Sequence, residues 1–311
     1  MNRPAIWPDG KRFAFTIFDD TDRSTRENVS RVYAFLADLG FRTTKSCWVF
    51  RGDPNRGKHA GETLDDEAYR RWVLDLHREG FEIGWHGATW HGSPRAETAR
   101  ALERFADVFG AYPATGANHA SNDECIYWGS ARVTGWRRAV YNVLTRYRND
   151  SRFRGHMDND PHYWGDLCRA KIKYYRNFVF RDINSLGLCP CMPYHDPLKP
   201  DVNYWFTSAD GDRADRFNRC LNESAQDRLE ASGGACIMYT HFANGFDDKG
   251  QIHPRFKALM ERLAKKNGWF VPVATLLDFL LTRTNHREIP LPALRRLERR
   301  WLLEKLFVGT D

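Results

Sequence analysis

The order of short apolar segments and helical segments constrains this chain more than any other feature. Residues 13–18 read Phe-Ala-Phe-Thr-Ile-Phe, a run typical of a buried strand. Apolar residues then recur at helical spacing from Val29 to Leu39, and Gly40 ends that helix. The same alternation predicts further strands at 43–50, 81–85, 114–117, 203–207, 235–240 and 269–273, and further helices at about 66–78, 93–109, 254–266 and 275–282. Strands that alternate with helices favour an α/β fold with a largely parallel sheet.

Two segments depart from this alternation. Residues 120–200 are rich in Tyr, Trp, Arg, Asn and His, and are too long for a plain connection, so we predict an insertion that covers one end of the sheet. Residues 286–311 predict a basic amphipathic helix, with Leu294, Leu297, Trp301 and Leu302 on one side. We therefore expect one domain over residues 1–285, followed by this helix. The helix either packs on the domain or lies on an anionic membrane.

Ionisable and polar residues stand directly after the predicted strands. In a parallel barrel these positions converge on the rim that carries catalysis. The residues are Asp19, Asp20, His86, Asn118, His119, Asp210 and His241.

Asp19 and Asp20 are the sharpest feature among them. Two carboxylates at one strand end repel each other, and a bound cation or a shared proton relieves the repulsion. One of them can bind a metal ion while the other accepts a proton from water. The alternative is a turn or helix cap at residues 20–22, where Asp is common.

Histidines supply candidate metal ligands. His86 directly follows a strand, and His91 lies five residues further on, one more than the spacing that places two rings on one helical face. His119 follows the next strand and competes with His91 for the third ligand position. We favour His91 slightly, provided that residues 87–90 form a loop. Each of these histidines could instead be a hydrogen-bonded structural residue.

His241 could protonate a leaving amine, and Asp210 could orient its ring. Tyr194 and His195 lie in a loop with the sequence Pro-Tyr-His-Asp-Pro, which we consider a candidate for substrate contact.

The formal charge of +7 and the pI near 9.0 favour anionic partners. No nucleic-acid-binding module is evident, so we expect no nucleic acid partner. The first residues do not resemble a signal peptide, and no segment approaches the roughly 20 apolar residues of a membrane span. Seven cysteines without paired spacing fit reduced thiols, so we expect a cytoplasmic protein, with the inner face of the membrane as the place of any peripheral contact.

At these residues the chain resembles the polysaccharide deacetylase family, which includes chitin and peptidoglycan deacetylases. Residues 16–20, Thr-Ile-Phe-Asp-Asp, are similar to the first family motif with one residue inserted, and residues 86–91 are similar to its paired-histidine motif, widened by one. Asn118 and His119 stand where the family has an arginine that steadies the catalytic base. Trp205 to Asp210 and Ile237 to His241 resemble the fourth and last motifs.

The resemblance implies a deformed (β/α) barrel of about seven parallel strands. It implies Asp19 as the base, His241 as the acid with Asp210 beside it, and a divalent metal ion, expected to be zinc. The implied ligands are Asp20, His86 and either His91 or His119, while the substrate contacts are Asn118, Tyr194, His195 and Trp205.

The implied reaction is removal of an N-acetyl group from an amino sugar of a bacterial surface polysaccharide or lipid-linked glycan. Two alternatives stay open, a metal-dependent amidase of non-sugar amides and a non-catalytic glycan-binding protein.

Overall fold

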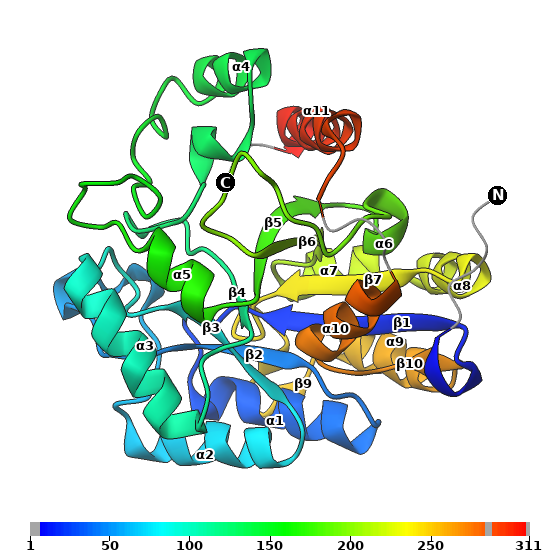
Figure 1. Cartoon of the computed structure of the whole chain (residues 1–311). Coiled ribbons are helices and arrows are strands. Elements are labelled where there is room, and N and C mark those ends of the chain that lie inside the picture. Colours follow the sequence, from blue (N-terminus) through cyan, green and yellow to red (C-terminus); the bar gives the residue numbers. More distant parts are fainter. Residues whose placement is uncertain (1–6, 284–287, 309–311) are drawn as a thin grey trace.

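The computed structural model describes residues 7–283 and 288–308 and contains a closed parallel barrel (Figure 1). Seven strands pair in chain order, and the seventh pairs back with the first. They are β1 (Phe13–Asp19), β2 (Thr44–Trp48), β3 (Glu82–Gly87), β4 (Thr115–Gly116), β5 (Tyr174–Phe180), β6 (Tyr204–Asp210) and β7 (Ala235–Thr240). The predicted α/β barrel is therefore confirmed.

The barrel is deformed around β1. One edge of β1 pairs with β7 from Ala14 to Asp19. The other edge is shared, because β10 (Gly268–Trp269) pairs with its beginning and β2 pairs with Phe18 and Asp19 at its end. β4 is only two residues long, so the wall is uneven there as well.

Helices surround the barrel (Figure 1). They are α1 (Arg26–Asp38), α2 (Glu67–Arg78), α3 (Arg95–Phe109), α4 (Trp136–Leu144), α5 (Gly165–Lys171), α6 (Ser185–Leu188), α7 (Ala214–Cys220), α8 (Glu223–Ser232), α9 (Pro254–Ala264), α10 (Val273–Arg283) and α11 (Leu291–Val308). Three 3₁₀ turns, η1 (Pro8–Gly10), η2 (Pro54–His59) and η3 (Gly129–Arg132), and a hairpin of β8 (Asp247–Asp248) and β9 (Gln251–Ile252) complete the described elements. None of the described helices has the length and apolar character needed to cross a lipid bilayer.

β5 lies inside the segment that the sequence predicted to be an insertion. Its sequence, Tyr-Tyr-Arg-Asn-Phe-Val-Phe, places Arg176 and Asn177 in the middle of a buried strand. These polar residues interrupt the apolar run by which a buried strand is recognised. The segment predicted to be an insertion thus contains one barrel strand, with η3, α4 and α5 before this strand and α6 after it.

Helix α11 packs on the protein. The side chains of Leu294, Leu297, Trp301 and Leu302 are buried. Trp301 stacks on Tyr141 of α4 with ring centroids 5.6 Å apart, and Figure 1 shows α4 and α11 together beyond β5. Because this apolar side is already covered, the expectation that it binds a membrane is not supported. The boundary predicted at residue 285 falls outside the described residues and stays a prediction.

Candidate active site and metal centre

A cavity of about 300 Å³ opens at the carboxyl ends of the barrel strands. This is the rim where parallel barrels carry their catalytic residues. Most of the polar residues that follow the strands in the sequence line it together. These are Asp20, His86, Asn118, His119, Asp210 and His241.

Asp19 does not line this cavity. Successive side chains of a strand point to opposite faces, so Asp20 lies on the same side as Phe18, and Phe18 packs on Phe206 inside the barrel. Asp19 points the other way, towards α1, and is fully buried. It accepts hydrogen bonds from the Tyr33 hydroxyl at 2.8 Å and from the Phe242 backbone N–H at 2.8 Å.

The buried ammonium of Lys45 lies 3.2 Å from the Asp19 carboxylate. Asp19 is therefore enclosed between β1, β2 and α1, away from the cavity in which a base must act. Its position contradicts the role of base that the resemblance implied.

Asp20 faces the cavity and is held by Arg176. The guanidinium of Arg176 on β5 donates to both carboxylate oxygens, at 2.8 and 2.5 Å. Such bidentate pairs fix the plane of a carboxylate. Arg176 thus contacts Asp20 and not Asp19.

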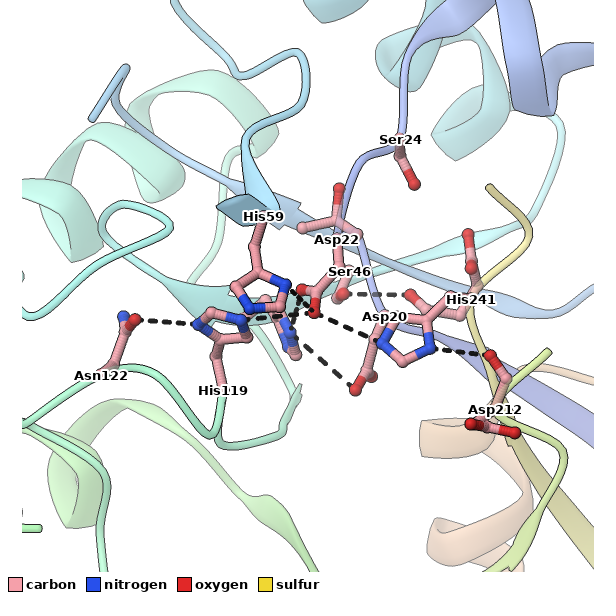
Figure 2. Close-up of polar contacts among 12 residues, drawn as sticks. Asp20, Asp22, Ser24, Ser46, His59, His119, Asn122, Asp212 and His241 are labelled. Carbon is pink, nitrogen blue, oxygen red and sulfur yellow. Dashed lines mark hydrogen bonds and ion pairs between the residues drawn. The ribbon is translucent and has the colours of Figure 1, made fainter. Parts of the chain in front are cut away.

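Asp22 lies at the centre of a group of imidazoles. His119 Nε2 lies 3.3 Å, His241 Nε2 3.4 Å and His59 Nδ1 3.6 Å from the Oδ2 atom of Asp22. His86 Nε2 lies 3.1 Å from its other oxygen. Figure 2 shows the rings of His59, His119 and His241 gathered around this carboxylate.

Two of these rings, those of His119 and His241, are oriented by hydrogen bonds at Nδ1, the nitrogen that faces away from Asp22. Asn122 Oδ1 lies 2.9 Å from His119 Nδ1, while the Asn122 amide donates to the Thr89 carbonyl and to Glu124. The Asn122 oxygen therefore accepts from His119 Nδ1–H, and Nε2 is the ring nitrogen that faces Asp22. In the same way the Asp212 carbonyl accepts from His241 Nδ1 at 2.9 Å, and Nε2 of His241 faces the cavity.

The electrostatics of the cluster follow from burial and from these contacts. Burial opposes ionisation of Asp22, but the surrounding imidazoles of His119, His241 and His86 outweigh it and hold the Asp22 pKa well below its usual range. Burial lowers the pKa of His86 and of His59. Burial also acts against protonation of His119 and His241, yet Asp22 raises the pKa of both, for His241 to about 9.

The donor set fits a divalent metal ion. Asp22, His59 and His119 each offer one ligand atom, and these atoms lie within 4.8 Å of one another. One carboxylate with two imidazoles is a set found in catalytic zinc sites.

Asp20 and His91 do not occupy the ligand positions expected for them. Asp20 is paired with Arg176, as described above. His91 lies outside the cavity, because its Nε2 accepts from the Asp53 backbone N–H at 2.7 Å and its Nδ1 faces the Gly92 carbonyl at 3.1 Å. Both ring nitrogens of His91 are thus engaged by backbone groups of neighbouring loops.

Asp210 lines the cavity but does not orient His241. Its carboxylate accepts from Arg216 at 2.9 Å, whereas His241 is held by the backbone of Asp212. The direction of the chain after β6 turns the carbonyl of Asp212 towards the imidazole, which sequence spacing does not reveal.

Of the four predicted substrate contacts, one lines the cavity and three do not. Asn118 lines the cavity, and its side chain is bound to both backbone groups of Ile126, so it closes the loop that follows β4. Tyr194 is fully buried against Asn177, and Trp205 is buried in the core. His195 faces backbone carbonyls of residues 202 and 203. The last three are not among the residues that line the cavity, which contradicts a substrate contact there.

The sequence reasoning missed three residues of the cluster. Asp22 had a signal, since it is the third carboxylate within four residues. His59 stands in η2, far from any strand end, and Arg176 stands inside a strand. Neither of the two has a local pattern that points to the site.

The fold of the chain is similar to that of solved structures over most of its length. The crystal structure of a protein from Mycobacterium smegmatis assigned as a polysaccharide deacetylase has a TM-score of 0.51 to this chain at 12% identity, with 92% of this chain and 96% of that chain covered. The PuuE allantoinase has a TM-score of 0.49 at 13% identity, covering 91% and 95% of the two chains. A Pseudomonas aeruginosa PAO1 protein assigned as a polysaccharide deacetylase has a TM-score of 0.48 at 13% identity, covering 91% and 96%. No family model and no curated protein sequence matches the chain. The chain thus has the fold of polysaccharide deacetylases.

Proposed function

We propose that this protein is a metal-dependent deacetylase that hydrolyses the N-acetyl group of an amino sugar in a bacterial surface polysaccharide or lipid-linked glycan. One observation carries the proposal: an arginine-held carboxylate, Asp20, and an imidazole-ringed carboxylate, Asp22, face the same cavity. This cavity lies at the carboxyl ends of the barrel strands, the rim where barrel enzymes act.

Asp22, His59 and His119 would hold the metal ion, which we expect to be zinc. His86 contacts the second oxygen of Asp22 and completes the surroundings of that carboxylate. When bound, the ion supplies Lewis acidity to the acetyl carbonyl and to a water molecule. This assignment moves the ligand role from Asp20, where the resemblance put it, to Asp22, and from His86 to His59.

Asp20 is the proposed general base. It would accept a proton from water as the water oxygen attacks the acetyl carbon. Arg176 keeps the carboxylate plane fixed, so the oxygen that accepts the proton stays directed at the cavity. The position of Asp20 thus supports the role that the resemblance gave to Asp19.

His241 is the proposed general acid. Its Nδ1 is committed to the Asp212 carbonyl, so the proton that it can deliver resides on Nε2, which faces the cavity. When the bond between carbon and nitrogen breaks, this proton would pass to the departing amine. Water and amide are consumed, and acetate and the free amino sugar are formed.

The test combines metal analysis with acetate release. Protein purified without chelator should contain about one divalent ion and release acetate from N-acetylglucosamine oligosaccharides. Asp22→Asn should lose both, because removal of one ligand carboxylate leaves two imidazoles, whereas the control Asp75→Asn on the exposed side of α2 should keep both.

Two outcomes would contradict the proposal. Metal-free protein that still binds these oligosaccharides without releasing acetate would favour a glycan-binding protein. Turnover of simple amides but not of acetamido sugars would favour an amidase.

A further inference from the structure

The described residues include three buried arginines, Arg132, Arg137 and Arg176. Two of them have carboxylate partners. Arg176 binds Asp20, and Arg137 binds Glu298 of α11. Arg132 has no carboxylate partner among the described residues.

Arg132 ends η3 and lines the same cavity as Asp20 and Asp22. Its side chain is 4% exposed, and within residues 7–283 and 288–308 neither its Nε nor its Nη2 has a hydrogen-bond partner. The ion pairs of that part of the chain include none with Arg132. A buried charge without a hydrogen-bond partner is costly, so the retained group calls for an explanation, and a ligand that accepts its hydrogen bonds supplies one.

Two indole rings fix the guanidinium in place. Its central carbon lies 3.3 Å from the ring centroid of Trp128 and 4.8 Å from that of Trp301. Such contacts use the flat face of the group and leave the N–H edge for a planar or tetrahedral oxyanion. Burial lowers the pKa of Arg132 to about 9, which still leaves the group charged at neutral pH.

We propose that Arg132 binds an anionic group of the substrate, a phosphate or a carboxylate carried by the acetamido sugar, in the cavity that holds the reacting amide. The inference rests on the proposed function and narrows its substrate to acidic acetamido sugars. Lys305 of α11 also lines the cavity. Arg132 is a specificity residue in this proposal and takes no part in bond cleavage.

The kinetic test compares a neutral acetamido sugar, N-acetylglucosamine, with two that carry an anionic group: N-acetylglucosamine 1-phosphate and N-acetylglucosaminuronic acid. Arg132→Gln should lower kcat/KM by about 10- to 100-fold for the preferred anionic sugar, the usual worth of a hydrogen bond to a charged group. The neutral sugar should change less than about threefold. The matched control is Arg138→Gln, which removes the same charge from the exposed side of α4.

The two anionic sugars distinguish the source of the charge. A selective loss with the phosphate sugar identifies a phosphate, and a selective loss with the uronate identifies a carboxylate. Equal losses with both indicate a general anion site. If Arg132→Gln affects neutral and anionic sugars alike, or neither, the proposal is overturned while the deacetylase function stands.

A binding measurement keeps the inference testable if no sugar is deacetylated. Calorimetry with N-acetylglucosamine 1-phosphate and with the uronate on chelator-treated protein requires no turnover. Weaker binding of either sugar to Arg132→Gln than to wild type and Arg138→Gln would support the anion site even if the proposed function fails. Equal binding of both sugars to all three proteins would reject it.

Discussion

Replacing Asp19 by Asn should destabilise the protein without removing the chemistry. The carboxylate of Asp19 is fully buried and serves three donors: the Tyr33 hydroxyl, the Phe242 backbone and the Lys45 ammonium. An Asn side chain keeps one oxygen and directs an N–H₂ group at donors. It also leaves the buried charge of Lys45 without its counter-ion.

The magnitude follows from that last effect. Removing one partner of a buried ion pair typically costs about 3–5 kcal/mol, because the remaining charge is uncompensated. Domains are commonly stable by only about 5–15 kcal/mol, so this loss is a large share of the total. In the double variant Asp19→Asn, Lys45→Met the orphaned charge is gone, and we expect part of the stability to return.

Urea unfolding of chelator-treated protein measures this free energy without a contribution from bound metal. Asp75→Asn is the control, since its ion pair with Arg78 is exposed and should contribute less than about 1 kcal/mol. The turnover of the folded fraction of Asp19→Asn should stay within a few-fold of wild type. An unchanged free energy of unfolding together with a loss of turnover of about 100-fold or more would refute this reasoning and restore Asp19 as the base.

Three further predictions concern the cavity and its surroundings. Asp20→Asn should lower kcat by about 10²- to 10⁴-fold, the usual contribution of a general base, while metal analysis finds the ion retained; loss of the ion would instead make Asp20 a ligand. At limiting zinc, His119→Ala should lose metal occupancy whereas His91→Ala should keep it, because both nitrogens of His91 are engaged by backbone groups; the opposite result would support the pairing implied by the sequence motif. Burial raises the pKa of Glu124 from 4.5 to about 7, so between these pH values the folded protein keeps a proton that the unfolded chain releases. Stability should therefore fall as pH rises through that window, by at most about 1.4 kcal/mol per unit, and urea unfolding of Glu124→Gln at pH 5 and pH 7 should show a weaker dependence.

The sequence alone determined most of the strands and helices, and the rim at which the strands end. Side-chain period is a local property, so strands and helices could be recognised one at a time. Because parallel strands end at a common rim, the positions of His86, His119 and His241 after strands were enough to bring them together.

Which face each side chain takes was decided only by the tertiary structure. β1 is buried on both faces, so its apolar sequence carries no sign of which side is the barrel interior. The contacts made in the folded barrel, with Phe18 packed on Phe206 and Tyr33 bound to Asp19, show that Asp20 points inward and Asp19 outward. Because side chains alternate along a strand, a shift of one residue moves every side chain of the strand to the opposite face.

Partners distant in the chain were likewise decided by the fold. Asp20 and Arg176 are separated by 156 residues, and Arg176 belongs to a strand that its own polar residues concealed. His59 reaches Asp22 from a 3₁₀ turn, and α11 covers its apolar side with α4 and β5 rather than leaving it exposed. The local sequence pattern indicates which side chains can be buried. The closure of the barrel decides which of them come into contact, because these contacts join segments that are distant in the chain and have no common sequence pattern.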